Sequence, residues 1–265
     1  MYSVNGIALD NPDMGWVLRA PSKPLSAFSY DRPNLTATGR DGVLPFIPPS
    51  VSPVSVSFVV QTPRAHLEHL LALFEQQGTL TVTGSQARAI DYETLSSTPV
   101  GYGPADSLVD VTFLLRFPEP FWRDFAVSNS PTFSLSTGGA DFNLWPGLSA
   151  PVGDALVKAR GPHSGLSLLD ASGAWVNLPS CSATETVVFD SATGEAGKNT
   201  SNTFALITDV SGAVDFGGPR GVFEITPQRR DPDPRIRHAE LMASATGVGA
   251  TTSLAFRGRA AYLLA

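Results

Sequence analysis

The feature that most constrains this chain is a period-two alternation of apolar and polar residues that recurs along most of its length. In the run 54–60, valine and phenylalanine alternate with serine, and in the run 109–117 apolar residues occupy every second position. Shorter candidate strands are 132–136, 166–169, 174–178, 186–189, 204–207 and 222–225, and a last long run extends over 253–264. Such alternation places one side of a strand in a core and the other in solvent, so we expect a mainly β protein.

One segment, about residues 63–77, has a different period and is predicted to be an α-helix. Apolar residues recur there at i, i+3, i+4 and i+7, namely Leu67, Leu70, Leu71 and Phe74. Thr62 is a candidate N-cap, Pro63 suits the first helical position and Gly78 suits the stop. A helix this short needs tertiary packing, so we expect it to lie against a sheet.

Composition favours many short strands joined by turns. Charged residues make up only 16% of the chain, against a usual share of about 25%, and there are 24 glycines and 22 prolines. The length of 265 residues allows two domains, and the Ser-, Thr-, Gly- and Pro-rich stretch 128–150 is the candidate boundary. We predict a domain of strands plus one helix over 1–127 and a β-sandwich over 151–265.

Charge disfavours nucleic acid as a ligand. The net charge is −6, with 8 basic against 12 acidic residues in 1–127 and 10 against 12 in the remainder. Neither part has the positive field that binding to phosphates requires.

Targeting and cysteine signals point to a protein folded in a reducing cytoplasm. The opening MYSVNGIALD lacks the basic and apolar regions of a signal peptide, and no run approaches the ~18 apolar residues of a membrane span. Cys181 is the only cysteine, which excludes an intrachain disulfide and a cysteine zinc site.

No catalytic signature is present, and we predict no catalytic, cofactor-binding or metal-binding residues. The G-x-S-x-G elbow, the P-loop, H-E-x-x-H and the EF-hand loop are all missing. Gly247-Val248-Gly249 is interpreted as a turn. His66 and His69 have a spacing that can hold a metal, but they are more simply two polar helix residues.

Three further features have a structural and a functional interpretation. Cys181 is favoured as a buried thiol over a nucleophile, which would need an oriented histidine. Asp231 and Asp233, spaced by prolines, are favoured as part of a self-neutralising loop over an acid–base pair; an interface loop is the alternative. Trp145 and Trp175 are favoured as core or interface residues over platforms that stack sugars.

Several N-terminal pieces occur in the order found in a known family. The chain opens with Tyr2-Ser3-Val4-Asn5-Gly6-Ile7-Ala8-Leu9, a strand, a turn and a strand. There follow Gly39-Arg40-Asp41-Gly42, the strand 54–60, the helix, the strands 80–82 and 108–117, and the ending Phe117-Pro118-Glu119-Pro120-Phe121-Trp122. This order resembles the N-terminal belt domain of siphophage distal tail (Dit) proteins, over about residues 1–125.

The C-terminal part resembles the galectin-like β-sandwich of the same family. The pieces that match are Pro151, the strands 154–160 and 166–178, the step Val188-Phe189-Asp190, and the final strand ending at 260–264. The loops 191–221 and 226–252 are longer than the family pattern leads us to expect. The chain has no room for the extra sugar-binding module that some larger members carry.

The resemblance implies a non-enzymatic structural protein of the virion, assembled in the host cytoplasm. Its expected form is a homohexameric ring at the tail tip, which joins the tail tube and tape measure protein to the tail-tip hub. DNA would pass through the ring only as cargo, and we expect the Asp and Glu residues of 1–127 to line the interior. No cofactor is implied.

Two other functions remain open at this stage. A β-sandwich with exposed tryptophans could be a carbohydrate-binding host-receptor adhesin. A related fold could also belong to another tail component, such as a tube protein.

Overall fold

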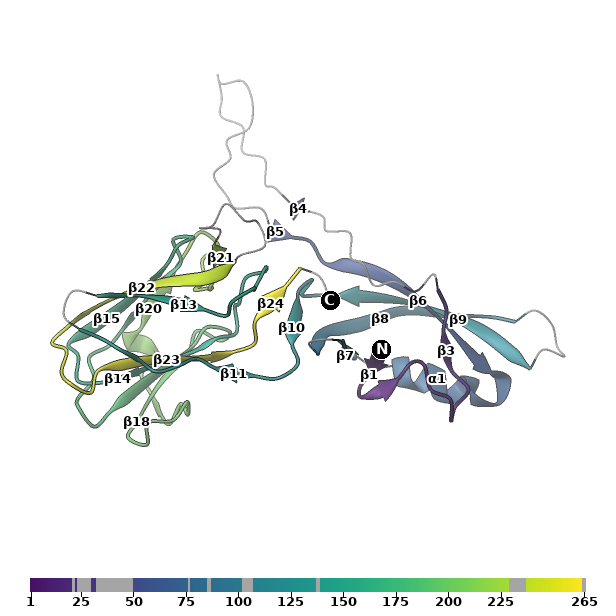
Figure 1. The fold of residues 1–265 in the computed structure, drawn as a ribbon, viewed down its shortest axis with the longest axis horizontal. Coiled ribbons are helices and arrows are strands. Elements are labelled where there is room, and N and C mark those ends of the chain that lie inside the picture. Colours follow the sequence, from purple (N-terminus) through teal and green to yellow (C-terminus); the bar gives the residue numbers. More distant parts are fainter. Residues whose placement is uncertain are drawn as a thin grey trace, which may run out of the picture. The chain divides into compact units, whose positions relative to one another are not determined.

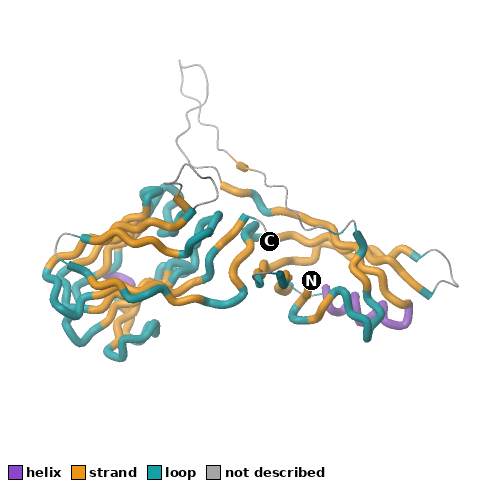
Figure 2. Tube along the Cα trace, in the orientation of Figure 1, coloured by secondary structure: helices purple, strands orange, loops and turns teal. Residues whose placement is uncertain are grey.

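A computed structural model describes residues 1–20, 22, 30–31, 50–75, 77–84, 87–101, 107–136, 139–228 and 237–263. Strands dominate both halves of the described chain, as Figure 2 shows. The prediction of a mainly β protein is therefore confirmed. Two compact units meet in sequence between Phe125 and Ala126. We call the described residues up to Phe125, together with Leu263, unit 1, and residues 126–262 unit 2.

Unit 1 contains twelve elements. They are β1 (Tyr2–Val4), β2 (Ile7–Ala8), β3 (Val17–Leu18), β4 (Tyr30–Asp31), β5 (Ser50–Val51), β6 (Val54–Pro63), the 3₁₀ turn η1 (Arg64–His66), α1 (Leu67–Phe74), β7 (Gly78–Val82), β8 (Arg88–Val100), β9 (Leu108–Phe117) and β10 (Trp122–Asp124).

One antiparallel sheet organises unit 1, with the order β2-β1-β7-β8-β9-β6-β3 (Figure 1). The longest ladder joins β6 to β9 over ten pairs, from Val54 opposite Phe117 to Pro63 opposite Leu108. These two strands are the alternating runs that the sequence predicted most clearly. Every second residue of each strand is buried, from Val54 to Thr62 in β6 and from Val109 to Phe117 in β9, and the residues between them are half-buried or exposed.

The predicted helix exists but is shorter than 63–77. Strand β6 extends through Thr62 to Pro63, because Thr62 pairs with Val109 and Pro63 with Leu108. Thr62 is therefore a buried strand residue and not the N-cap, and helical turns begin only at Arg64. Gly78 begins β7 and does not end the helix, since α1 stops at Phe74.

Aromatic packing fixes α1 against one face of the sheet, as we expected for so short a helix. The Phe74 ring stacks on Phe113 of β9 with centroids 3.9 Å apart, and its centroid lies 6.0 Å from that of Tyr92 of β8. Leu70 is also buried, whereas Leu67 and Leu71 are only half-buried. The predicted apolar stripe is thus only partly covered.

Unit 2 contains fifteen elements. They are β11 (Ser128–Asn129), β12 (Phe133–Ser134), β13 (Ala140–Leu144), β14 (Leu156–Arg160), β15 (Gly165–Asp170), β16 (Trp175–Leu178), β17 (Thr186–Asp190), β18 (Ala196–Asn199), β19 (Thr208–Asp209), the 3₁₀ turn η2 (Ser211–Ala213), β20 (Asp215–Gly217), β21 (Pro227–Gln228), β22 (His238–Thr246), β23 (Ser253–Gly258) and β24 (Ala261–Tyr262).

Two antiparallel sheets pack face to face in unit 2. One has the order β11-β23-β14-β17-β18-β19, with β12 also beside β23; the other has the order β13-β22-β15-β16-β20, with β21 beside β22. Rings from both sheets meet between them: Phe189 lies 5.3 Å from Phe216, and Phe133 lies 4.6 Å from Phe142. This is a β-sandwich with its core between the sheets.

Several predicted boundaries in unit 2 are wrong. Residues 128–150, predicted as a linker, form β11, β12 and β13, because Phe142 and Leu144 alternate into the core. The run 204–207 is irregular, since the Asn199 amide donates to the carbonyl oxygens of Thr203 and Ala205. The run 222–225 forms only an isolated bridge, and 253–264 is divided between β23 and β24.

Candidate functional site

Strand β8 has an open edge over its second half. Residues Arg88–Tyr92 pair with β7, whereas Glu93–Val100 pair with β9 alone among the described strands. A bulge between Thr94 and Ser96 leaves Leu95 outside the ladder, with 50% of its side chain exposed. The outward backbone groups of this stretch lack a sheet partner, which makes the edge a template for another strand.

Pro99 determines which backbone groups of the edge face outward. Proline has no N–H, so inside a ladder it occupies a position whose nitrogen faces away from the paired strand. Backbone direction alternates with a period of two, so the N–H of Ser97 also faces away from β9. Ser97 is exposed, and its N–H is the donor that a docking strand would meet next to Pro99.

A groove of about 470 Å³ lies between α1 and this edge. Its lining residues are Glu68, Leu71, Ala72, Phe74, Glu75, Thr94, Leu95, Ser96 and Ser97. The Thr94 hydroxyl is buried without a hydrogen-bond partner among the described residues. The groove therefore combines apolar side chains with polar ones, among them an unsatisfied hydroxyl, and a segment that docks along β8 can cover both.

The opposite side of the sheet carries a second open edge. Strand β3 pairs only with Val60 and Gln61 of β6, and the Ser22 hydroxyl exchanges hydrogen bonds with the backbone of Val59. Among the described residues, Val54–Phe58 therefore pair with β9 alone. Within the described part of unit 1, one edge is thus free at β8 and another at β6.

The sheet face directed away from α1 is nearly neutral. Arg116 lies 3.7 Å from Glu93, and Arg19 lies 3.9 Å from Asp110, so each of these carboxylates faces an arginine. The remaining positions on β6, β8 and β9 are divided between serine or threonine and apolar residues, of which Val100, Leu108 and Leu114 are exposed. The prediction that the acidic residues of 1–127 line a ring interior stays a prediction, and on this face two of them are neutralised.

The Pro-Glu-Pro-Phe-Trp ending is a packing motif. Trp122 is fully buried, and the Phe117 ring meets it edge-on with centroids 6.4 Å apart. The guanidinium of Arg123, almost fully buried, donates to both carboxylate oxygens of Glu119, with Nη2 at 2.9 Å from each. These contacts hold β10 beside β8 and offer no reactive group.

The opening motif is a tight hairpin that is anchored to the sheet. Asn5 and Gly6 form its two-residue turn, and both have the positive φ that such turns require, 49° and 84°. The Asn5 Oδ1 also accepts a 3.0 Å hydrogen bond from the backbone N–H of Thr79 in β7. Gly39-Arg40-Asp41-Gly42, the next motif of the resemblance, lies outside the described residues.

The two helix histidines have structural contacts. The Nδ1 of His66 lies 2.8 Å from the carbonyl oxygen of Met14, and the His66 and His69 rings meet edge-on. Among the described residues, no cluster of three or more histidine, cysteine or acidic side chains could hold a metal ion. In the same part of the chain, no helix is long and apolar enough to cross a membrane.

The fold brings Cys181 beside His163, a proximity that the sequence did not reveal. The two residues exchange backbone hydrogen bonds of 2.9 Å, and both are buried. Burial raises the pKa of the Cys181 thiol, and burial together with Lys198 lowers the pKa of His163. Neither ring nitrogen of His163 has a hydrogen-bond partner among the described residues, so no third group orients it for catalysis.

The other residues noted in the sequence, Trp145, Trp175 and Gly247, do not form one site. Both tryptophans are half-buried: Trp145 donates from Nε1 to the Ser128 hydroxyl at 3.1 Å, and Trp175 lies on the outer side of its sheet. Gly247, with φ 64°, lies in the turn between β22 and β23. The loop 231–234 with Asp231 and Asp233 lies outside the described residues.

Comparison with known proteins gives matches in structure alone. No family model and no curated protein sequence matches the chain. The crystal structure of the Dit protein of SPP1, described as a paradigm of the hub adsorption apparatus in phages infecting Gram-positive hosts, aligns with a TM-score of 0.57 and 10% identity, over 97% of this chain and 98% of that one. Structures of the activated phage P2 baseplate with Ca and with Sr align with TM-scores of 0.43 and 0.44, at 8% and 7% identity, over 96% of this chain and 93% of theirs.

Because it covers 97% of this chain, the match to the SPP1 protein includes both units. At 10% identity such a match establishes the fold. The chain therefore has the fold of the SPP1 Dit protein, as the resemblance in its sequence predicted.

Proposed function

We propose that this protein is a non-enzymatic structural component of a phage tail tip, in which unit 1 closes into a ring with five further copies of itself. The observation that carries the proposal is the alignment with SPP1 Dit over 97% of this chain and 98% of that one. A likeness that includes both units in one alignment favours a shared architecture over a chance match of a single sandwich.

The two open edges of unit 1 support ring formation. They lie on opposite sides of the β8-β9-β6-β3 part of the sheet, so the β8 edge of one copy can pair with the β6 edge of the next. Such a contact is heterologous, and it satisfies every edge only when the ring closes. Main-chain hydrogen bonds would provide affinity, and the groove beside α1 would receive side chains of the neighbouring copy.

In this proposal the ring lies between the tail tube with its tape measure protein and the tail-tip hub, within the virion. DNA passes through the opening without specific contacts. The helix-free face of unit 1 suits that role, because its carboxylates Glu93 and Asp110 are paired with Arg116 and Arg19 and its other described side chains are uncharged. A wall without net positive charge does not retain phosphates.

The size of the purified full-length protein tests the proposal. Mass photometry should give a species of six subunits, and negative-stain images should show a ring with a central opening. A protein that remains a single subunit at all concentrations, and that is not found in assembled particles, would contradict it.

A variant pair at one position tests the β8 edge. Ser97→Pro removes the outward N–H and leaves the ladder with β9 intact, whereas Ser97→Ala keeps the N–H and removes only the hydroxyl. The lost hydrogen bond recurs at each contact of the ring, so Ser97→Pro should raise the concentration needed for assembly about tenfold. Equal assembly of both variants would exclude pairing along β8.

A further inference from the structure

The outer side of the second sheet of unit 2 carries a row of apolar side chains across three strands. Met242 of β22 lies opposite Leu169 of β15, which lies opposite Trp175 of β16. Met242 is 44% exposed, Leu169 is 38% exposed and Trp175 is half-buried. These three side chains, which we call the apolar row, form a continuous strip that no described residue covers.

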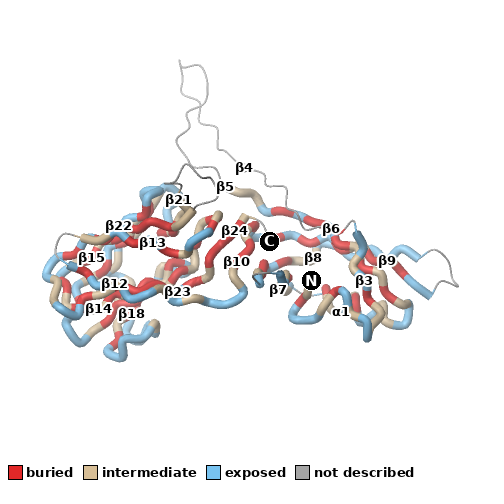
Figure 3. The backbone as a smooth tube through the Cα atoms, viewed as in Figure 1, coloured by how far each residue is buried: buried red, intermediate tan, exposed pale blue. Residues whose placement is uncertain are grey.

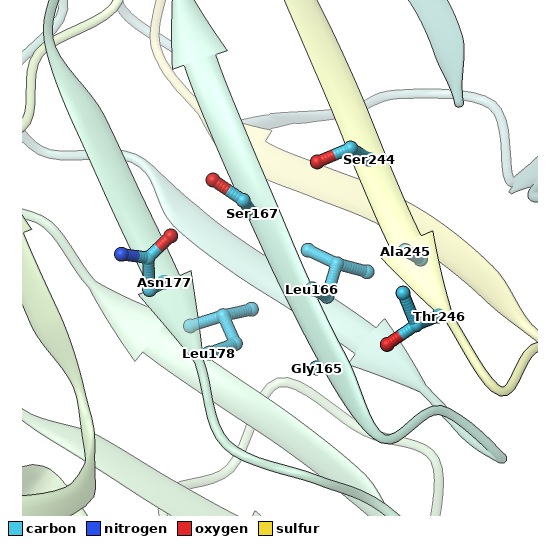
Figure 4. A pocket seen from close by; sticks show the side chains of 8 residues that line it. All are labelled: Gly165, Leu166, Ser167, Asn177, Leu178, Ser244, Ala245 and Thr246. Carbon is cyan, nitrogen blue, oxygen red and sulfur yellow. The ribbon is translucent and has the colours of Figure 1, made fainter. Parts of the chain in front are cut away.

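A second row, made of polar side chains, runs parallel to the first. Ser244 of β22, Ser167 of β15, Asn177 of β16 and Asp215 of β20 are successive cross-strand partners, and we call them the polar row. None of these side chains has a hydrogen-bond partner within the described part of the chain. Figure 4 shows Ser167, Ser244 and Asn177 on neighbouring strands, with their polar atoms directed away from the backbone.

The surface is hollowed along part of these rows, next to Trp175 and Asp215, which line neither hollow. Two hollows of about 550 and 460 Å³ adjoin one another, since Ser167 and Ser244 line both of them. The first also contacts Asn177, and the second contacts Leu169, Met242 and Asp141. Neighbouring strands are spaced by about 4.8 Å, so the polar row offers hydrogen-bonding groups over about 14 Å.

Trp175 approaches β20 closely at one end of the apolar row. Its cross-strand partner is Gly217, and a Cβ added there would lie 3.3 Å from two carbons of the indole. The missing side chain at 217 therefore leaves room for the indole, and a larger residue there would press against the ring.

We propose that these two rows bind a short neutral saccharide. The apolar C–H face of a sugar ring would lie on Trp175 and Leu169, and its hydroxyls would exchange hydrogen bonds with Asn177, Ser167 and Ser244. The ligand is neutral because the rows contain no lysine or arginine, while Asp215 and the adjacent Asp141 would repel an anion. A shallow surface that combines apolar side chains with hydroxyl and amide groups suits a sugar better than an apolar ligand.

This binding activity is separate from ring formation, because every residue in it belongs to unit 2. The test uses the full-length protein and three neutral trisaccharides, cellotriose, maltotriose and tri-N-acetylchitotriose, with trigalacturonate as the anionic comparison. Binding is measured by saturation-transfer NMR and by tryptophan fluorescence. At least one neutral trisaccharide should bind with a Kd of about 1 mM or tighter, and trigalacturonate should not.

Three variants locate the site. Ser167→Leu fills both hollows and should abolish binding, and Asn177→Ala removes one amide and should weaken binding about tenfold. Asn129→Ala is the matched control, since Asn129 is an exposed strand asparagine on the other sheet, and it should bind like the parent. Thermal melting of each variant verifies that it is folded.

Three results would overturn the proposal: no binding of any neutral trisaccharide by the folded protein, undiminished binding by Ser167→Leu, or binding of trigalacturonate as tight as that of the neutral sugars. Particle size is measured on the same samples. If the parent protein bound no saccharide and Ser167→Leu changed the particle size, the proposal would also be overturned, because the rows would then be a contact between copies.

Discussion

The two units bury their apolar residues in different ways. Unit 1 covers one face of a single sheet with a short helix, and its open edges at β8 and β6 are left without partners among the described residues. Unit 2 closes a core between two sheets, with rings such as Phe189 and Phe216 in contact across it. Figure 3 shows the alternation of buried and exposed positions along the strands of both units. Among the described residues, unit 2 thus encloses its core between two sheets, whereas unit 1 keeps two strand edges unpaired.

The strongest test of this comparison removes one large core residue from each unit. Trp122→Ala in unit 1 and Phe189→Ala in unit 2 each leave a cavity, because both side chains are fully buried. Each should destabilise its own unit by about 3–5 kcal/mol. Differential scanning calorimetry should therefore show one transition moved to lower temperature and the other unchanged.

The same calorimetry on the parent protein supplies the reference, with one transition for each unit. If both transitions moved together in either variant, the two units would be one cooperative domain. Loss of ring formation in Trp122→Ala alone would sharpen the comparison, since only unit 1 is proposed to assemble.

A smaller effect is expected from a buried carboxylate that belongs to unit 2 only. Asp170, almost fully buried, accepts hydrogen bonds from the backbone N–H groups of Thr226 at 3.1 Å and Ser172 at 2.8 Å, and from the Thr226 hydroxyl. Asp170→Ala leaves these donors unsatisfied and should cost about 2–3 kcal/mol. Asp170→Asn keeps one acceptor and should cost less; a larger loss for Asn than for Ala would contradict this account.

The stability of unit 2 should also depend on pH through His163. Its pKa is lowered from 6.5, first by burial and then by Lys198. Below pH 6.5 the unfolded chain therefore binds a proton that the folded chain does not, so stability falls as the pH decreases toward the folded pKa. The transition of unit 2 should move to lower temperature between pH 7 and about pH 5, and that of unit 1 should move less.

His163→Phe is the control for this prediction, because it fills a similar volume and does not titrate. In this variant the transition temperature of unit 2 should depend less on pH between pH 7 and about pH 5. The ion pair of Lys198 with Glu185 is retained in the variant, and the pKa of Glu185 is lowered by its hydrogen bonds with Ser182, so it titrates below this range. An unchanged slope in His163→Phe would assign the pH dependence to another group.

The sequence was most informative where structure depends on neighbours along the chain. The alternation in 54–60 and 109–117 predicted the two central strands of unit 1, and Asn5-Gly6 predicted the opening turn. The helix ends were wrong because pairing of Thr62 and Pro63 with β9 outweighed their local preference for a cap and a first turn.

Surfaces were not predictable from the sequence, because they depend on register between distant segments. Ser167 and Ser244 become neighbours only through the pairing of β15 with β22, and nothing local marks either serine. The open edge of β8 likewise depends on a distant strand, because β7 pairs with β8 only as far as Tyr92. Trp175 was noted in the sequence, but its half-buried position beside Gly217 follows from the pairing with β20.

The smallest effects on stability are expected at exposed leucines, and there the two units should differ in function. Leu95→Ser in unit 1 and Leu169→Ser in unit 2 alter leucines that are 50% and 38% exposed, so each should change stability by at most about 1 kcal/mol. Leu95 borders the groove beside α1, so its loss should weaken ring assembly and leave saccharide binding intact. Leu169 lies in the apolar row, so its loss should do the reverse. Particle size and trisaccharide affinity measured on both variants would show whether assembly belongs to unit 1 and ligand binding to unit 2. A leucine variant that impaired both properties would contradict this division, because one surface would then serve both.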